Sequence, residues 1–209
     1  MGDTIKLALP LTEEKVRTLS AGDFVTLDGE IVITAGLPTH HRIIEHIDAG
    51  KALPIDIAGG TFFHLGSYSR ERDGAFEVLY MNPTTSTRFN PLMPRIIRHF
   101  GLRAVGGKGG LDRQCADTMK EVGCVYLSFL GGGSPLLSDA IKDVVAVAWQ
   151  DHVAYYRLVK LQVEDLGPLE VAIDSKGNSL FDQLQATARD RLGTILHELE
   201  VGRNTSQSR

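Results

Sequence analysis

A run of four hydroxyl side chains followed by an arginine is the most unusual feature of this sequence. Thr84, Thr85, Ser86 and Thr87 come directly after a proline, and Arg88 ends the run. Hydroxyls and exposed backbone N–H groups in a tight loop can surround a carboxylate, and a guanidinium can bind both of its oxygens. The same composition is also typical of an ordinary Ser/Thr turn that caps the next element. Thr84, Thr85 and Arg88 are therefore candidate substrate-binding residues.

A lysine between glycines is the second candidate for anion binding. Lys108 lies at the centre of Gly-Gly-Lys-Gly-Gly, residues 106–110. Glycines let the backbone approach an anion closely, and the ammonium adds a full positive charge. The spacing is not that of a Walker phosphate-binding motif, and a tight turn of the chain explains the glycines equally well. A third glycine-rich segment, residues 131–134, we interpret as a turn before a helix.

Three histidines stand near the ends of expected elements. His40 and His41 open a helix, where adjacent residues point to different faces and make a poor pair of metal ligands. His40 lies near the end of a strand and could donate to a substrate or transfer a proton, so it is a candidate catalytic residue. His64 lies in an apolar strand, and a hydrogen-bonded histidine of the core is the simpler interpretation.

The elements that must position these residues predict a mixed α/β fold. Strands at residues 104–105 and 124–130 each lead into a glycine-rich turn, and helices follow at 112–122 and 135–141. Repeated units of strand, glycine loop and helix favour parallel pairing, with the loops gathered at one end of the sheet.

Further strands and a last helix complete the expected fold. Asp28-Gly29 lies between two apolar runs and predicts a two-residue hairpin. Residues 155–163 and 169–174 predict two strands, and residues 180–199 predict an amphipathic closing helix.

Composition and charge are ordinary for one soluble globular domain. Of the 209 residues, 43% are hydrophobic and 23% are charged, and the formal net charge is −4. No repeat or linker divides the chain, so we expect one domain over residues 1–200 and a polar, disordered tail at 201–209. The acidic balance gives no general attraction to nucleic acid or an anionic membrane, and no apolar run reaches the roughly 18 residues of a membrane helix.

The two cysteines, Cys115 and Cys124, limit the metal chemistry of this chain. A cubane iron–sulfur cluster takes at least three thiolates, and a structural zinc site usually takes four ligands. We therefore expect no metal site here. Few cysteines and no export signal together indicate a cytoplasmic location.

Taken together, these segments resemble the β-subunit of the iron–sulfur hydro-lyases, the family of L(+)-tartrate dehydratase and class I fumarase. The most specific element is Pro83-Thr84-Thr85-Ser86-x-Arg88, which is similar to the family's Gly-Pro-Thr-Thr-Ser-x-Arg with Asn82 in place of the glycine. Four further segments fit in the family's order: Phe63-His64-x-Gly66, Gly107-Lys108-Gly109-Gly110, Val163-x-Asp165-x-Gly167-Pro168-Leu169 and Ile173-Asp174-x-x-Gly177-Asn178. The resemblance covers nearly the whole chain.

The resemblance implies a swivelling β/β/α domain that works with an iron–sulfur α-subunit. That partner would supply the cysteines of a [4Fe-4S] cluster, whose open iron acts as a Lewis acid on a small hydroxy-dicarboxylate. Arg88 and Lys108 would hold carboxylate oxygens, and Thr84 and Thr85 would lie against the substrate. We therefore expect the hydroxyl-rich run and the glycine-flanked lysine to meet in space and to form one positively charged cradle. Thr84 matches the threonine proposed as the base at the carbon that loses its proton. The expected assembly is a hetero-oligomer such as α2β2, or a homodimer when the chain is isolated.

One departure from the family pattern concerns the other end of the substrate. The family has Arg-Asp-x-x-His before the first long helix, where the arginine binds a substrate carboxylate. Here Gly36 and Leu37 stand in place of Arg-Asp, and His40 matches the histidine. His41 or Arg42 are the neighbouring groups that could compensate.

Two alternatives to a hydro-lyase subunit remain open on the sequence. The missing arginine favours a non-catalytic module that binds a small carboxylate or serves as an assembly paralogue. The glycine loops alone favour a phosphate-binding α/β domain.

Overall fold

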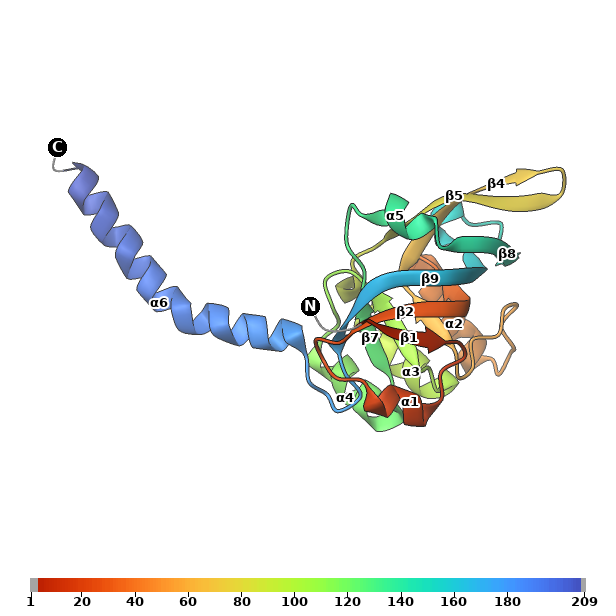
Figure 1. The fold of residues 1–209 in the computed structure, drawn as a ribbon, viewed down its shortest axis with the longest axis horizontal. Helices are drawn as coiled ribbons and strands as arrows, with labels where there is room; N and C mark the ends of the chain where they lie inside the picture. Colours follow the sequence, from red (N-terminus) through yellow and green to blue (C-terminus); the bar gives the residue numbers. More distant parts are fainter. Residues whose placement is uncertain (1–3, 208–209) are drawn as a thin grey trace.

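Seven strands form one mixed sheet in the computed structural model of the chain, which describes residues 4–207 (Figure 1). Its strands are β1 (Ile5–Ala8), β2 (Phe24–Ile33), β3 (Thr61–Phe63), β6 (Ala104–Gly107), β7 (Val125–Ser128), β8 (Ile141–Ala148) and β9 (Leu158–Ile173). They lie in the order β1-β2-β3-β6-β7-β9-β8, and β9 also pairs with β2. Strands β2, β3, β6, β7 and β9 therefore close into a ring. The predicted mixed α/β class is confirmed.

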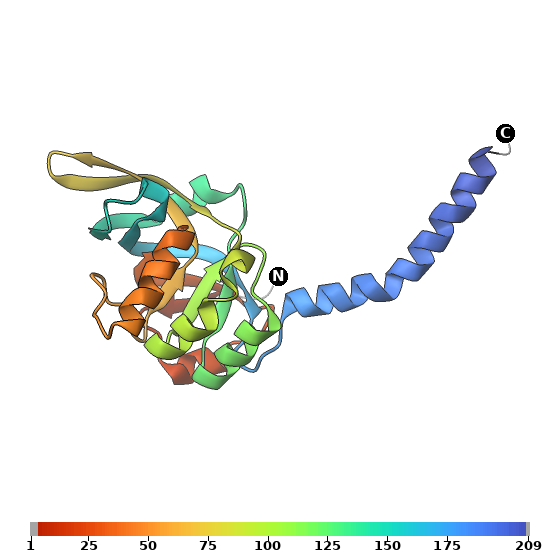
Figure 2. The same ribbon diagram turned by 180° about the vertical axis from the view of Figure 1, so that it is seen from behind.

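Helices and a projecting hairpin surround this ring. The helices are α1 (Glu13–Thr18), α2 (Leu37–Asp48), α3 (Met93–Phe100), α4 (Arg113–Val122), α5 (Ser134–Ser138) and α6 (Leu180–Gln207), with short 3-10 turns η1 (Ser86–Phe89) and η2 (Ala154–Tyr156). Strands β4 (Leu65–Arg72) and β5 (Ala75–Pro83) form a separate antiparallel hairpin. The hairpin tip and α6 both extend away from the body, on different sides of it (Figures 1 and 2). None of the described helices is long and apolar enough to cross a membrane.

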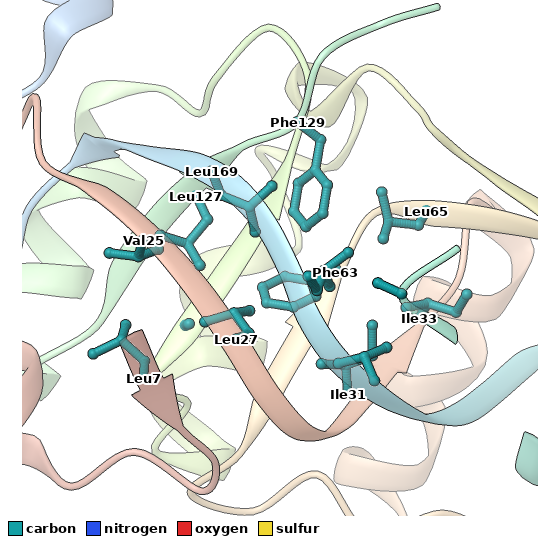
Figure 3. Close-up of a cluster of buried hydrophobic side chains, with 14 of the residues drawn as sticks. Leu7, Val25, Leu27, Ile31, Ile33, Phe63, Leu65, Leu127, Phe129 and Leu169 are labelled. Carbon is teal, nitrogen blue, oxygen red and sulfur yellow. The ribbon is translucent and has the colours of Figure 1, made fainter. Parts of the chain in front are cut away.

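Side chains alternate in direction along the strands, and this alternation creates two apolar clusters. Figure 3 shows the inner one, where side chains such as Leu27, Phe63 and Leu127 meet between the strands of the ring. Phe62, the neighbour of Phe63, belongs to the second cluster together with residues of α2, α3 and α4. Successive residues of a strand point to opposite faces, so the ring has one cluster inside and the other beneath the helices. These two clusters fix the strand ends that carry the candidate residues.

The predicted strand, glycine loop and helix units are confirmed. Strands β3, β6 and β7 run parallel to one another. Helix α4 follows the glycine loop after β6, and the Asp112 side chain accepts from Cys115 N at 3.0 Å to cap its first turn. The helix ends at Gly123, which has a φ of +72°, in the left-handed region that glycine tolerates. These local signals were sufficient to place the element.

The predicted hairpin at Asp28-Gly29 is wrong. Residues 24–33 form the single strand β2, which pairs in parallel with β1 and antiparallel with β9. Gly29 has a φ of +128°, and a Cβ there would lie 2.8 Å from Leu9 Cβ. The glycine therefore allows a neighbouring segment to approach an irregular point of the strand, rather than reversing the chain.

The strands predicted at residues 155–163 and 169–174 are a single element, β9, which spans Leu158–Ile173. Gly167 and Pro168 lie within it, and its pairing with β2 shows register shifts near Leu166. The closing helix is longer than predicted, because α6 continues to Gln207. The helix thus includes part of the segment predicted as a polar tail, and residues 208–209 of that tail lie outside the described residues.

Candidate functional site

The hydroxyl-rich run and the glycine-flanked lysine lie side by side. Thr85 and Lys108 form an isolated parallel β-bridge. Ser86 N donates to Lys108 O at 2.8 Å, and Lys108 N donates to Thr84 O at 3.1 Å. The prediction that these two loops meet in space is therefore confirmed for their backbones.

A pocket of about 410 Å³ opens beside this bridge. The residues that line it are Ala35, Gly66, Asn82, Pro83, Thr84, Arg88, Lys108, Val153, Tyr155 and Tyr156. Arg88 and Lys108 are the charged members of this set, and Arg88 Nη2 donates to Thr84 Oγ1. Thr84 and Lys108 are half-buried, whereas Arg88 is exposed. The structure thus brings Thr84, Arg88 and Lys108 to one pocket whose two charged groups are both positive, which suits an anion.

Thr85 has a different place from the other three predicted binding residues. Its backbone forms the bridge to Lys108, and it is half-buried but is not among the residues that line the pocket. Its methyl group would contact a Cβ at Gly109, 3.5 Å away. The contact with substrate expected for Thr85 stays a prediction.

Gly107 is required for the close approach of the two loops. A Cβ there would lie 2.4 Å from Ser86 Oγ and 3.2 Å from Thr84 O. The first distance is shorter than a Cβ atom can accept, and the second is tight against a backbone oxygen, which moves less easily than a side chain. The glycine before Lys108 therefore sets the geometry of the cation-bearing loop.

We expect Gly107→Ala to separate the loops and to lower the free energy of unfolding by about 1–3 kcal/mol. Thermal unfolding and binding of a dicarboxylate, followed by calorimetry, measure the two effects. Gly133→Ala is the matched control, because its Cβ would make an ordinary contact with Leu130 Cβ at 3.4 Å. Equal stability and anion affinity in the two variants would contradict this reading of Gly107.

A buried hydrogen-bond network lies behind the hydroxyl run. Ser86 Oγ is 2.8 Å from His64 Nδ1 and 2.8 Å from Tyr126 OH, and Gly110 N donates to Tyr126 OH at 3.3 Å. Burial lowers the pKa of His64 well below its usual range and raises the pKa of Tyr126, so both side chains are neutral. A neutral, fully buried chain of hydrogen bonds positions groups rather than carrying charge. The prediction that His64 is a hydrogen-bonded core histidine is confirmed.

His40 is also buried and is not among the residues that line the pocket. Its Nδ1 donates to Gly36 O at 2.7 Å, and its ring stacks on Phe89 with centroids 3.9 Å apart. Burial lowers the pKa of His40 to about 4. Phe89 directly follows Arg88. The catalytic role expected for His40 stays a prediction, and its contacts are those of a residue that supports the Arg88 loop.

The buried histidines make stability depend on pH. Between pH 6.5 and about 4 His40 binds a proton in the unfolded chain but not in the folded one, so stability falls as pH falls through this window. We expect a loss of about 3 kcal/mol from this group at full effect. Thermal unfolding of wild type and His40→Phe from pH 7 to 4.5 measures it, and the variant should give a flatter profile. His197→Gln, at an exposed position, should keep the wild-type slope; equal slopes in all three proteins would contradict the prediction.

Among the described residues, neither His41 nor Arg42 replaces the family's missing arginine, because neither of them lines the pocket. Arg42 is paired with Asp151 at 2.9 Å and lies over the Trp149 ring, away from the residues that line the pocket. Tyr155 and Tyr156 form the wall beside Ala35 instead. The sequence reasoning missed these tyrosines, because it placed them at the start of a strand. Their approach to the pocket depends on contacts far along the chain, for which the sequence gives no local signal.

The described residues contain no cluster of three or more His, Cys, Asp or Glu side chains that could hold a metal ion. Cys115 and Cys124 are both buried, and burial raises the pKa of each thiol. A protonated, buried thiol is a poor ligand for iron. The side chains of this chain therefore do not fit an iron–sulfur cluster.

A second pocket, of about 360 Å³, lies near the amino end of β3. Its lysine, Lys160, is paired with Glu30 at 2.8 Å, and Asp56 adds another acidic group. It therefore lacks the two unopposed positive groups of the first pocket, which is the better site for an anion.

The fold and the first pocket define an α/β domain with a candidate anion site between two loops. The sequence matches the family described as Fumarase C-terminus over residues 2–184, and the chain belongs to this family. It is 32% identical over 187 residues to a protein of Methanocaldococcus jannaschii provisionally named L(+)-tartrate dehydratase subunit beta, covering 89% of this chain and 95% of that one.

Two further relatives support the same family assignment. The L(+)-tartrate dehydratase subunit beta of Escherichia coli K12 is 26% identical over 193 residues, which cover 92% of this chain and 94% of that one. A Geobacillus stearothermophilus protein provisionally named fumarate hydratase class I is 34% identical over 189 residues, 90% of this chain. The match covers 35% of that longer protein. The resemblance noted from the motifs is therefore confirmed over most of the chain.

Proposed function

We propose that the chain is the β-subunit of a [4Fe-4S]-dependent hydro-lyase that binds a small hydroxy-dicarboxylate and, with an α-subunit, reversibly eliminates water. The observation that carries the proposal is that Thr84, Arg88 and Lys108 line one pocket. The relatives support it, because their names are those of a dehydratase and a hydratase.

The three side chains suit the charge changes of such a dehydration. The reaction removes a proton from a carbon next to a carboxylate and hydroxide from the neighbouring carbon, so negative charge builds up on the carboxylate as the proton leaves. Arg88 and Lys108 would stabilise this charge, which is a larger effect in a closed site than in water. Arg88 also donates to Thr84 Oγ1, which would stabilise the alkoxide form in which that oxygen could accept the proton from carbon and return to a hydroxyl.

The cluster is proposed to belong to the partner. The two buried cysteines of this chain do not fit it, and two of the relatives are named as beta subunits. A beta subunit implies an alpha subunit, so we propose a hetero-oligomer in which the partner supplies the cluster and closes the pocket. The swivelling β/β/α arrangement implied by the family is part of the same proposal.

The test is to co-express the chain with a cluster-bearing α-subunit and to assay dehydration without oxygen. The panel contains hydroxy-dicarboxylates and, because Val153, Tyr155 and Tyr156 also line the pocket, hydroxy acids with one carboxylate. We expect turnover of at least one dicarboxylate. An intact cluster with no turnover of any compound would reject the proposal.

The second candidate is a non-catalytic carboxylate-binding or assembly paralogue. The absence of a family arginine at Gly36 favours it. It predicts that the isolated chain binds a dicarboxylate with micromolar affinity and never associates with a cluster-bearing subunit. Calorimetry and co-purification distinguish the two candidates without any assay of turnover.

A further inference from the structure

Within the described residues, nothing packs against the last helix over most of its length. Its 28 residues have a contour length of about 42 Å, and its first turn is anchored, where Phe181 packs edge-on against Tyr126 with ring centroids 5.9 Å apart. Every residue from 182 to 201 is exposed. Figures 1 and 2 show the helix leaving the body of the protein. An isolated helix of this length is only marginally stable in water without tertiary packing.

One face of the exposed helix is apolar. Leu184, Ala188, Leu192, Ile195 and Leu199 recur every three or four residues and so lie on one stripe. Leu184 is 68% exposed, Leu192 52% and Leu199 55%. A contiguous apolar stripe of this kind on a soluble protein is typical of a helix–helix interface.

Most of the stripe lies beyond the match to the family model. The match to the Fumarase C-terminus family ends at residue 184, whereas α6 continues to Gln207. The residues of α6 from 185 to 201 are exposed, so the contacts that hold the domain together do not explain their apolar side chains.

Charges beside the stripe favour a second copy of the same helix as its partner. Arg191 and Glu198 are seven residues apart, so they lie on the same edge of the stripe. When two copies of α6 align antiparallel with Leu192 against Ile195, Arg191 of each copy lies opposite Glu198 of the other. In a parallel pair the residue opposite Arg191 is Leu196, and this pairing is lost. Neither charged group has an ion-pair partner within the described part of the chain.

We propose that α6 is a dimerisation arm that pairs antiparallel with α6 of a second copy of this chain. Leu192 of one copy packs on Ile195 of the other, Ala188 packs on Leu199, and two Arg191–Glu198 pairs flank the contact. The proposal does not depend on the reaction that the protein catalyses.

Sedimentation of the full chain alone tests the dimer. We expect a dimer at micromolar concentration, and Leu192→Asp/Ile195→Asp to raise its dissociation constant by about 100-fold or more, because each copy then buries two unpaired carboxylates. Ala186→Asp/His197→Asp adds aspartates to the opposite face of the same helix and is the matched control that should leave the dimer intact. Circular dichroism and thermal unfolding show whether each variant keeps the folded domain.

Charge exchange tests the antiparallel alignment. Arg191→Glu and Glu198→Arg should each weaken the dimer by about tenfold, and the double variant should restore it, because both pairs then form with reversed sign. A mixture of Ala188→Cys and Leu199→Cys chains should form the mixed disulfide on oxidation, since both native cysteines are buried. A parallel dimer would instead link Leu199→Cys chains to one another.

Three results would overturn the proposal. The first is a monomeric wild-type chain across the concentration range, and the second is a dimer unaffected by Leu192→Asp/Ile195→Asp. The third is association through the stripe that occurs only when an α-subunit is present, which would assign α6 to the partner subunit.

Discussion

Replacing Arg88 by alanine is expected to lower kcat/KM of the assembled enzyme by about 100- to 1000-fold. The guanidinium lines the pocket with Lys108, and it donates to Thr84 Oγ1. Its removal would leave a substrate carboxylate without a bidentate partner and would also release the threonine hydroxyl. The effect should therefore appear in both KM and kcat.

Arg88→Lys and Arg95→Ala make this prediction specific. The lysine keeps the charge but loses the two parallel donors, so it should recover only part of the activity. Arg95 lies on α3 and is paired with Asp48 at the surface, away from the pocket. Its alanine variant removes the same charge from the protein and should keep kcat/KM within about twofold, because exposed pairs contribute little. An Arg88→Ala enzyme as active as Arg95→Ala would show that the substrate is held elsewhere.

The two loops of the candidate site could be predicted from the sequence because their signals are local. A proline, four hydroxyls and an arginine mark one loop, and glycines around Lys108 mark the other. Their meeting is not a local property, because Lys108 follows β6 of the main sheet whereas the hydroxyl run follows β5 of the separate hairpin. The two loops come together because Thr84 N donates to His64 O, just after β3, and β3 is the neighbour of β6.

The failures of prediction arise where distant parts of the chain decide the local structure. Asp28-Gly29 has the composition of a hairpin, but pairing of Gly29 with Val163 of β9 keeps the strand continuous. The wall formed by Tyr155 and Tyr156, and the bond between Ser86 and Tyr126, likewise join residues far apart in the sequence. No spacing rule identifies such contacts, because they are properties of the folded sheet.

The placement of His40 shows why a matching residue type is insufficient to assign a role. The sequence placed this histidine near a strand end, where a proton donor would be useful. In the fold its ring is stacked on Phe89 and its Nδ1 is bound to Gly36 O, so neither nitrogen lines the pocket. A group with a pKa lowered to about 4 is also neutral at pH 7. Its contacts therefore suit a role in holding the Arg88 loop.

Thr84→Val is expected to lower kcat by about 100- to 10,000-fold while changing the dissociation constant of a dicarboxylate only slightly. Valine keeps the shape of the side chain and removes the hydroxyl, the group that could accept the proton. Arg88 and Lys108 remain in the pocket of the variant, so carboxylate binding should persist. Steady-state kinetics of the assembled enzyme and calorimetry of the β-chain measure the two quantities separately.

Thr84→Ser tests whether Thr84 acts as a base through its hydroxyl or only as a steric contact. Serine keeps the oxygen that receives the Arg88 hydrogen bond and loses only the methyl group, so most of the activity should return if the hydroxyl does chemistry. Exchange of the substrate's carbon-bound proton with solvent gives a second readout, which Thr84→Val should abolish and Thr84→Ser should retain. If Thr84→Val still catalyses this exchange at the wild-type rate, the proton is removed by another group, and Thr84 then serves to orient Arg88 and the carboxylate.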